Sequence, residues 1–530
     1  MNEIDRARQM HIADIPRRSA IRYGKKIALI DGETQISYQT FQQLVDLLAK
    51  HLYQQGLRKG DKLMILSYNC WQFPTILYAA AQLGVISVPI NFMLNAKEVQ
   101  YLLQHASPKM VIVEDRLCSV MQLALDNLAT QSPEKVVLQL DSEQPILSGW
   151  QTFDHFLQPL DFKLPEIALS SSDPIRMMYT SGTESLPKGV LLSSESLMWQ
   201  YSSCMMEGQM HTQDREIHAF PMYHCAQLDA FLNVDLLLGA TSYIFQRFDP
   251  EKVLATIEQQ KINKLFCPPT AWIALLNSPH FASTDLSSLS KAYYGASTMP
   301  KTVIQQLLKK LPHIRFWQFY GQTEMAPLAT VLHPEAHQDF AESVGRPALH
   351  VETQIMDEQG HLLAVGELGE IVHRSVHLTL GYDQQPEKTQ ESFKYGWFHS
   401  GDLGYLDQYG YLYVVDRIKD MVKTGGENVS TREVEDILYR HDAVQEVAVF
   451  ALPHPHWIEA VTAAVILHPG QDCNAQQLIE FCTQHLSTYK VPKQIFLVQS
   501  LPKNASGKIL KRELKKQYTA SALDHHQAQS

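Results

Sequence analysis

Residues 38–113 alternate between helical and strand periodicity, and this alternation limits the fold more than any other feature of the chain. Apolar residues recur every three to four positions in some segments and form short continuous runs in others. The expected order is helix 38–54, strand 62–66, helix 71–83, strand 85–89, helix 96–105 and strand 110–113. This order predicts a parallel sheet covered by helices, with ligands bound at loops beyond the carboxyl ends of the strands.

The sequence changes character after about Val344. Short alternating runs such as residues 410–415 predict antiparallel strands and hairpins. Strands 444–450 and 460–467 and a helix 474–486 predict a compact unit of roughly a hundred residues, the size of a small domain. We therefore expect an α/β + α+β fold. Its parts are a large N-terminal domain with parallel sheets and a β-rich part (1–418), a small mobile C-terminal α+β domain (419–518), and a frayed polar tail (519–530).

The composition excludes several classes of protein. With 45% hydrophobic residues the 530-residue chain can bury a large core, and its net charge of -11 argues against nucleic acid as a main partner. Its 7 cysteines contain no CxxC pair, which favours a reducing compartment over disulfides or a zinc site. The charged start lacks the apolar core of a signal peptide, and residues 74–90 are too short and interrupted to span a bilayer. We expect a cytoplasmic protein with at most peripheral membrane contact.

One loop carries the strongest chemical signal. Residues 179–190 read YTSGTESLPKGV and follow an apolar run that we predict to end a strand. Glycine lets backbone N–H groups turn inward, hydroxyls donate hydrogen bonds and lysine adds a positive charge, so the segment is suited to hold phosphates. It is not a Walker A loop, because Pro187 replaces a glycine and no Ser or Thr follows the lysine. The candidate phosphate-binding residues are Thr180, Ser181, Gly182, Thr183 and Lys188.

This loop resembles the phosphate-binding signature of the adenylate-forming superfamily, T-S-G-T-T-G-x-P-K-G, except that Glu184 and Ser185 replace the second Thr and the Gly. The superfamily contains acyl-CoA synthetases, peptide-synthetase adenylation domains and beetle luciferases. Further segments resemble its other motifs in the same order, at residues 294–297, 320–324, 397–404, 416–420 and 501–512. The ordered set is most similar to bacterial fatty-acyl-CoA synthetases.

The resemblance implies a nucleotide site. A carboxylate beside a triphosphate acts mainly through Mg²⁺, so Glu324 is expected to hold this metal together with Thr183. Thr323 is expected to touch the α-phosphate, next to Tyr320 and Gly321 of the same motif. The other positions implied at the nucleotide are Gly295 and Ala296 against the adenine, Asp402 at the ribose hydroxyls and Arg417 at the ribose or a phosphate.

The remaining implied roles concern the acid, CoA and domain movement. Lys508 matches the catalytic lysine, whose charge favours the pentavalent transition state at the α-phosphate. Lys419 matches the hinge of the small domain, and Gly425 and Gly426 match glycines that line the passage for the pantetheine arm. His224 matches a histidine at the acyl site, and by its sequence alone it is equally a core or surface histidine.

The resemblance thus implies an ATP-dependent ligase that uses Mg²⁺ and CoA. It would convert a carboxylic acid to acyl-adenylate with release of pyrophosphate, and then transfer the acyl group to CoA with release of AMP. Leu, Phe, Trp and Met are frequent in segments 223–234, 268–275 and 293–299, so we expect a medium- or long-chain fatty acid. The alternatives are an aryl acid, the loading of an acyl carrier protein, and a non-catalytic acyl- or nucleotide-binding protein. The sequence also leaves open whether the protein forms a homodimer.

Overall fold

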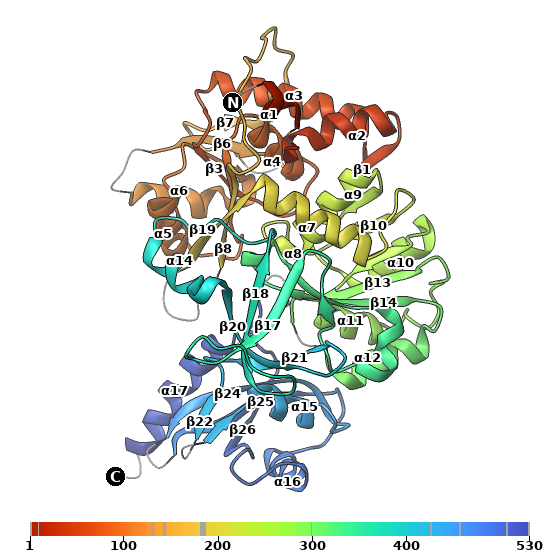
Figure 1. Ribbon diagram of the computed structural model, residues 1–530, viewed down its shortest axis with the longest axis vertical. Coiled ribbons are helices and arrows are strands. Elements are labelled where there is room, and N and C mark those ends of the chain that lie inside the picture. Colours follow the sequence, from red (N-terminus) through yellow and green to blue (C-terminus); the bar gives the residue numbers. More distant parts are fainter. Residues whose placement is uncertain are drawn as a thin grey trace.

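Two large sheets flanked by helices form most of the molecule, and a smaller sheet leads to a separate domain at the C-terminal end (Figure 1). The structure is a computed structural model. It describes residues 3–8, 10–128, 132–140, 145–180, 187–297, 299–424, 427–454, 457–504 and 507–527. The predicted parallel sheets, β-rich part and small C-terminal α+β domain are all present.

The first sheet has nine strands, of which β14, β13, β12, β10, β11 and β1 are neighbours in this order and run parallel. Because parallel strands end at the same edge of a sheet, the loops after β10, β12, β13 and β14 gather there. Across the sheet the strands are β16 (Arg346–Pro347), β15 (Leu328–Leu332), β14 (Arg315–Gly321), β13 (Lys291–Gly295), β12 (Lys264–Phe266), β10 (Arg215–His218), β11 (Thr241–Ile244), β1 (Ile27–Asp31) and β2 (Thr34–Ser37).

The second sheet has eight strands and a parallel centre made by β8, β4, β3, β5, β6 and β7. At one side β9 returns antiparallel to β8, and β19 adds to β9 from nearly two hundred residues further along the chain. The strands are β19 (Gly381–Tyr382), β9 (Lys188–Ser193), β8 (Pro174–Thr180), β4 (Ile86–Pro89), β3 (Lys62–Leu66), β5 (Met110–Glu114), β6 (Glu134–Leu138) and β7 (Gln151–Thr152).

Helices cover these sheets. They are α1 (Glu3–Arg8), α2 (Ile15–Tyr23), α3 (Tyr38–Gln54), α4 (Gln72–Gln82), α5 (Ala96–Ala106), α6 (Cys118–Asp126), α7 (Ser194–Glu207), α8 (Cys225–Gln227), α9 (Asn233–Leu238), α10 (Pro250–Gln260), α11 (Pro269–Leu276), α12 (Lys301–Lys310), α13 (His337–Phe340) and α14 (Pro386–Ser392). A π-helical turn, η4 (Leu228–Leu232), joins α8 to α9.

The elements predicted between residues 38 and 113 are confirmed, with boundaries that shift by a residue or so. Local chemistry explains their starts. The Ser37 side chain accepts a hydrogen bond from the Thr40 N–H at the start of α3, and Asn95 and Glu98 form a capping box at the start of α5. In α4 residues Phe73–Ala81 are all buried, which agrees with the continuous apolar sequence of this helix.

A four-stranded antiparallel sheet follows, in the order β17 (Val351–Met356), β18 (Gly369–Ser375), β20 (Phe398–Leu406) and β21 (Leu412–Arg417). Most of the alternating run at residues 410–415 therefore lies in a strand, β21, as predicted. In the C-terminal domain the sheet order is β23 (Glu427–Val429), β22 (Val422–Thr424), β25 (Ile458–Leu467) and β24 (Val444–His454), with β26 (Gln494–Leu497) beside β25. Helices α15 (Thr431–Leu438) and α16 (Ala475–His485) pack with this sheet.

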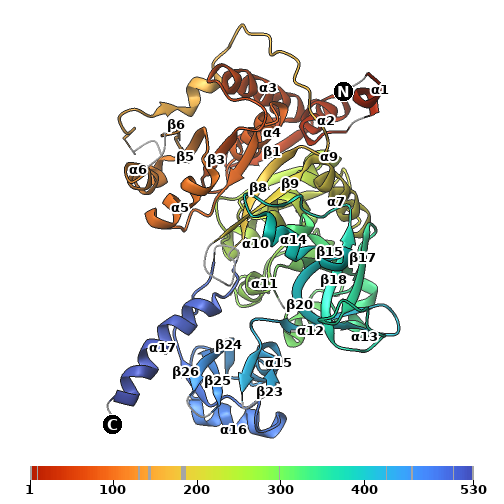
Figure 2. The same cartoon turned by 60° about the vertical axis from the view of Figure 1, so that its left-hand side comes forward.

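The last helix, α17 (Lys511–Gln527), packs on the C-terminal sheet at its start and then projects away from the body of the molecule (Figure 2). Leu514 is buried against Phe450, and the Tyr518 ring stacks on Phe496 at 3.9 Å. The region from Thr519 that we predicted as a frayed polar tail thus continues this helix as far as Gln527.

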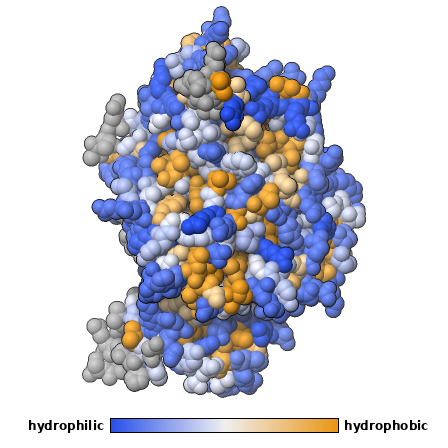
Figure 3. All heavy atoms as spheres, in the orientation of Figure 1, coloured by the Kyte–Doolittle hydropathy of each residue, from blue (hydrophilic) through white to orange (hydrophobic). Residues whose placement is uncertain are grey.

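The largest buried cluster lies between the helices and the two large sheets, and its biggest side chains include Trp272, Trp317 and Tyr293. All seven cysteines are free. In the part of the chain that the structure describes, no helix is both long and apolar enough to cross a membrane. The face seen in Figure 3 is mostly hydrophilic, with hydrophobic groups gathered over the four-stranded sheet.

Candidate active site

The ends of β13 and β14 bring two predicted glycines close to neighbouring backbone. A Cβ atom on Gly295 would lie 2.2 Å from the Phe319 carbonyl oxygen, and one on Gly321 would lie 1.9 Å from that of Pro327. Only glycine fits at these contacts. Ala296 follows with a left-handed φ of 64°, which turns the chain away from the sheet edge.

The predicted phosphate loop joins two paired strands. Thr180 ends β8 and Lys188 begins β9, and these two residues are direct partners in the antiparallel pair. The loop therefore leaves and re-enters the second sheet at one point. Ser181, Gly182 and Thr183 lie outside the described residues.

Glu324 and Lys188 meet at Tyr382. The Tyr382 hydroxyl donates a hydrogen bond to Glu324 Oε1 at 3.0 Å, and the Lys188 ammonium lies 4.9 Å from the centre of the Tyr382 ring. Glu324 is buried, and its backbone carbonyl accepts the Thr379 N–H at 2.8 Å. Sequence reasoning did not find Tyr382, since it lies 58 residues from Glu324 and no local pattern marks it.

Asp402 and Arg417 form an ion pair on neighbouring strands. Arg417 Nε lies 3.0 Å from Asp402 Oδ1, and the Tyr320 hydroxyl donates to Asp402 Oδ2 at 2.5 Å. Burial alone would lower the pKa of Arg417, but the neighbouring acidic groups, Asp402 first among them, together outweigh it and the pKa is raised. The structure thus joins three predicted site residues from β14, β20 and β21.

His224 begins the short helix α8 and is held as a neutral imidazole. Its Nδ1 accepts the Ala226 N–H at 3.2 Å, so the ring proton is on Nε2. Burial, and next the positive charge of Lys508, lower the pKa of His224 to about 4. The adjacent Cys225 Sγ lies 3.4 Å from Thr323 Oγ1, so this segment contacts the predicted α-phosphate residue.

The loop that carries Lys508 is docked on the large domain. Thr270 Oγ1 donates to the Gly507 carbonyl at 3.4 Å, and Gly507 has a φ of 81°. The Lys508 side chain is exposed, yet desolvation by the surrounding protein, followed by the charge of Arg417, lowers its pKa to about 8. Asp402 acts on it in the opposite sense. Lys508 therefore lies in the same electrostatic environment as the ion pair.

Lys419 lies in a short exposed turn between β21 and β22, the last strand of the large domain and the first of the small one. The Ile418 N–H donates to the Gly401 carbonyl, and the Asp420 N–H donates to that of Arg417, both at 3.0 Å. Asp416 holds the other side of this turn, as its Oδ2 accepts the Thr431 N–H at 2.6 Å at the start of α15. Gly425 and Gly426 lie outside the described residues.

A small pocket opens beside His224. The described residues that line it are Phe220, Pro221, His224, Ala226, Gln227, Phe266, Pro268 and Ala296. They come from the loops after β10, β12 and β13, the edge where the parallel strands end. We call this space the acyl pocket, since all three segments predicted to form the acid site contribute to it.

Two family descriptions cover most of the chain. That of the AMP-binding enzyme matches residues 16–383, and that of the AMP-binding enzyme C-terminal domain matches residues 433–508. The chain belongs to the AMP-binding enzyme family. The resemblance to the adenylate-forming superfamily is thereby confirmed, and with it the cofactors of its CoA ligases, ATP, Mg²⁺ and CoA.

Individual members resemble this AMP-binding enzyme over nearly its full length. It is 31% identical to feruloyl-CoA synthase from Amycolatopsis sp over 96% of this chain and 100% of that protein. It is 32% identical to the long-chain-fatty-acid–CoA ligase FadD13 from Mycobacterium tuberculosis (strain ATCC 25618 / H37Rv), over 92% of this chain and 94% of that one. The crystal structure of the anthranilate CoA ligase AuaEII with anthranoyl-AMP matches with a TM-score of 0.88 at 25% identity, over 97% and 98% of the two chains. These relatives place this AMP-binding enzyme among AMP-forming acid–CoA ligases, and they differ in the acid they use.

Proposed function

We propose that this protein joins a hydrophobic monocarboxylic acid to CoA through an acyl-adenylate, with Lys508 as the catalytic lysine. The observation that carries this proposal is the docked loop of the small domain. Through Thr270 and Gly507 it brings Lys508 near Asp402, Arg417 and the His224 imidazole. This arrangement supports a role in the adenylation half of the reaction, because an ammonium group next to the α-phosphate would stabilise the charge that develops there.

In the adenylation step, each of these residues has a distinct task. Asp402 would accept the ribose hydroxyls, and Arg417 would hold this carboxylate in place and face the ribose or a phosphate. The neutral His224 would donate its Nε2–H to a carboxylate oxygen of the acid and orient it for attack on the α-phosphate. Lys188 and Thr323 would contact phosphate oxygens, and the negative charge of the departing pyrophosphate would be balanced by Lys188.

The residues around Glu324 fit a magnesium ion. Mg²⁺ prefers carboxylate oxygens, and Glu324 offers a buried carboxylate that Tyr382 orients with a single hydrogen bond. When bound, the ion would neutralise phosphate charge. The second expected ligand, Thr183, is outside the described residues. We therefore propose Glu324 as the metal ligand whose role can be tested.

For the thioester-forming half, we propose that residues 419–518 rotate as a unit about Lys419. This would withdraw Lys508 and bring the segment with Gly425 and Gly426 to the site, where the CoA thiol attacks the acyl carbonyl and AMP leaves. The turn at Lys419 supports this proposal, since it is short, exposed and lies between the two domains.

The class of the acid is the finer part of the proposal. The sequence predicts a medium- or long-chain fatty acid, and the name of the relative FadD13 agrees with it. Feruloyl-CoA synthase and the anthranilate CoA ligase act, by their names, on aromatic acids. Both classes are hydrophobic monocarboxylic acids, and a panel of acids tested as substrates distinguishes them.

The test is pyrophosphate release from MgATP with acetate, hexanoate, dodecanoate, hexadecanoate and benzoate, each with and without CoA. We expect CoA-dependent turnover with at least one acid, and AMP and acyl-CoA in equal amounts. K508A should bind ATP but lose adenylation by at least 10²-fold, as typical for loss of a group that stabilises transition-state charge. K503A is the matched control, because Lys503 lies in the same part of the chain but pairs with Glu446 at 2.6 Å.

The other outcomes are equally informative. Pyrophosphate limited to one enzyme equivalent, with no turnover on adding CoA, would indicate a carrier protein as the acceptor. ATP binding without pyrophosphate for any acid would indicate a non-catalytic binding protein and would contradict the proposal.

A further inference from the structure

The acyl pocket is small in this structure. About 220 Å³ of empty space lies between its lining residues, and this value includes the part open to solvent. Its lining is apolar apart from His224 and Gln227. If the proposed function holds, the side chains that close this pocket decide which acid it accepts.

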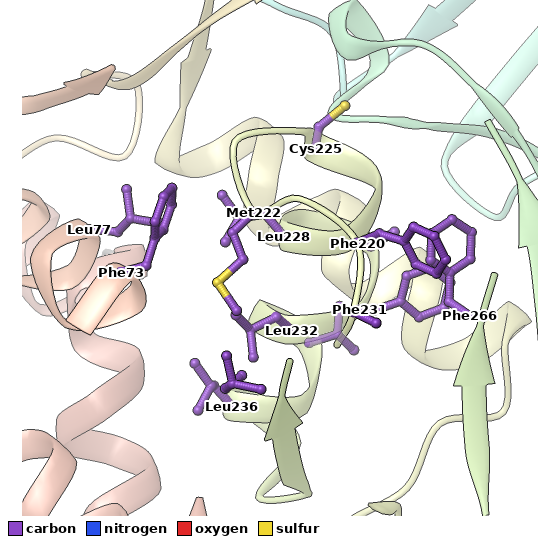
Figure 4. Packing of buried hydrophobic residues seen from close by; sticks show 14 of the residues in the cluster. Phe73, Leu77, Phe220, Met222, Cys225, Leu228, Phe231, Leu232, Leu236 and Phe266 are labelled. Carbon is purple, nitrogen blue, oxygen red and sulfur yellow. The ribbon is translucent and has the colours of Figure 1, made fainter. Parts of the chain in front are cut away.

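Two phenylalanine rings line the pocket, and a third packs directly behind one of them. Phe220 and Phe266 line it, and their rings meet edge to face with centroids 5.9 Å apart. Phe231, from the π-helical turn η4, stacks on Phe266 with centroids 4.5 Å apart. Figure 4 shows these three rings grouped on one side of the helical segment, and all three are buried. We call them the phenylalanine floor.

More rings support the phenylalanine floor from behind. Phe248 stacks on Phe220 at 5.3 Å, and Tyr293 and Phe319 contact Phe231 at 5.2 and 5.7 Å. Tyr293 is fully buried, and its hydroxyl donates to the Gly208 carbonyl. A floor ring cannot tilt aside without displacing a second buried ring.

Charged groups lie below the rings. Side chains two residues apart in a strand share a face, so Lys264 follows Phe266 into the interior along β12. The Lys264 ammonium lies 5.8 Å from the Phe231 ring centre and 2.8 Å from Glu216 Oε2, and it also pairs with Asp235. Burial disfavours the charged ammonium, but Asp235 and then Glu216 outweigh it and raise the pKa of Lys264 well above its ordinary value.

This ionic layer makes a deep alkyl channel unfavourable in this direction. Lys264, Glu216 and Asp235 are fully buried, and His218 Nε2 lies 3.3 Å from Asp235 Oδ2. A hydrocarbon chain that passed the phenylalanine floor would have to separate these charges, and a buried charge without its partner is costly.

The pocket wall offers no partner for a second charge on the acid. His224 is neutral. Both ends of the Gln227 amide already form hydrogen bonds, Oε1 with the Phe220 N–H at 3.2 Å and Nε2 with His218 Nδ1 at 2.8 Å. No lysine or arginine is among the described residues that line the pocket. The lining therefore fits one carboxylate and an uncharged remainder.

We propose that the acid is a compact aromatic monocarboxylic acid, and that Phe220 and Phe266 set the limit on its size. A flat ring can lie against the faces and edges of these two side chains, which gives aromatic contacts that an alkyl chain cannot make. This inference rests on the proposed function. Within it, the inference selects aromatic acids and excludes long-chain fatty acids as the preferred substrate.

The experiment compares benzoate, cinnamate, hexanoate, dodecanoate and hexadecanoate as substrates of the full-length enzyme with MgATP and CoA. We expect kcat/KM for benzoate or cinnamate to exceed that for dodecanoate by at least tenfold. In F266A the ratio of dodecanoate to benzoate should rise at least tenfold, since the floor is opened. F281A is the matched control, because Phe281 is buried but does not line the pocket.

If F266A does not fold, F266L keeps an apolar side chain in the core and tests the same floor. Dodecanoate or hexadecanoate as the preferred substrate of the unaltered enzyme would overturn the inference and leave the ligase function intact. An unchanged preference in folded F266A and F266L would also overturn it. Turnover with none of the acids would instead count against the proposed function itself.

Discussion

Asp402 and Arg417 face each other across the antiparallel strands β20 and β21, with 3.0 Å between Asp402 Oδ1 and Arg417 Nε. The Tyr320 hydroxyl donates to the other carboxylate oxygen. The Asp402 carboxylate is thus held by two residues from different sheets, Arg417 of the four-stranded sheet and Tyr320 of the nine-stranded sheet. Its orientation is set before any nucleotide binds, which reduces the entropy lost on binding.

We expect D402N to weaken ATP binding without unfolding the protein. Asparagine keeps the shape of the side chain but loses the charge that pairs with Arg417 and accepts ribose hydroxyls. Hydrogen bonds to a charged group contribute about 1.5–3 kcal/mol, which corresponds to roughly a 10–100-fold rise in KM for ATP. Steady-state kinetics with varied ATP measure this rise.

The control is D407N. Asp407 lies in the turn between the same two strands, and its Oδ1 accepts the Tyr409 and Tyr411 N–H groups at 2.9 and 2.8 Å. Asparagine preserves this acceptor, so KM for ATP should not change. Equal KM values for D402N and the unaltered enzyme would contradict the assignment of Asp402 to the ribose.

Adenylation should depend on pH through Lys508. Its pKa is lowered to about 8, so the ammonium is present below that pH and is lost as the pH rises through it. We expect kcat/KM for ATP in the adenylation half-reaction to be constant near pH 7 and to fall about tenfold per pH unit well above pH 8. Pyrophosphate release at saturating acid gives the profile.

Two variants check that Lys508 is the group that titrates. K508R keeps its charge to above pH 12, so any remaining activity should lack the fall above pH 8. K503A should show the same profile as the unaltered enzyme. A profile for K508R that still falls near pH 8 would assign the titration to another group.

Tyr382 should tune the metal site through Glu324. Y382F keeps the ring beside Lys188 and removes the hydroxyl that donates to Glu324 Oε1. We expect about a tenfold higher KM for Mg²⁺, since partners that orient a metal-binding carboxylate typically contribute 10–100-fold to affinity. Titration of the reaction with MgCl₂ at fixed ATP measures it.

Y405F serves as the comparison variant. The Tyr405 ring stacks on Tyr413 at the surface of the four-stranded sheet, apart from Glu324. Its KM for Mg²⁺ should equal that of the unaltered enzyme. If Y382F also leaves this KM unchanged, Glu324 does not depend on Tyr382 for metal binding.

Asp416 should stabilise the start of the small domain. Its Oδ2 accepts hydrogen bonds from the Thr431 N–H at 2.6 Å and the Thr431 hydroxyl at 2.8 Å. D416A would leave these buried donors unpaired, at a cost of about 1–3 kcal/mol. We expect faster amide hydrogen exchange in residues 431–438, measured by mass spectrometry, with unchanged exchange in the large domain.

D472A provides the reference for that measurement, since Asp472 is exposed in the same domain. Its substitution should change the exchange of α15 little. Equal protection of α15 in D416A and D472A would show that Asp416 does not hold this helix.

Much of the fold could be predicted from local patterns. Helix α3 and strand β3 could be predicted from apolar periodicity, because the conformation of a short segment depends mainly on the pattern of its own buried residues. The predicted positions of Glu324, Asp402 and Lys508 likewise came from motif order along the chain. The structure adds that Asp402 binds Arg417 and that Lys508 lies close enough to both to be affected by their charges.

Other parts could not be predicted, since they depend on packing between distant segments. Tyr382 reaches Glu324 because β19 joins β9, and Thr270 reaches Gly507 across 237 residues. The phenylalanine floor joins the end of β12 to a π-helical turn, and it was the packing of these rings that redirected the proposed acid from a long alkyl chain to a compact aromatic one.

The sequence by itself thus determined the family, the succession of helices and strands, and the residue types that the chemistry needs, because these depend on short-range periodicity and on motifs a few residues long. Only the tertiary structure decided which of these side chains meet and which residues line the acyl pocket. Such contacts are set by the close packing of residues that lie far apart in the chain, and a pattern along the sequence does not encode their distances.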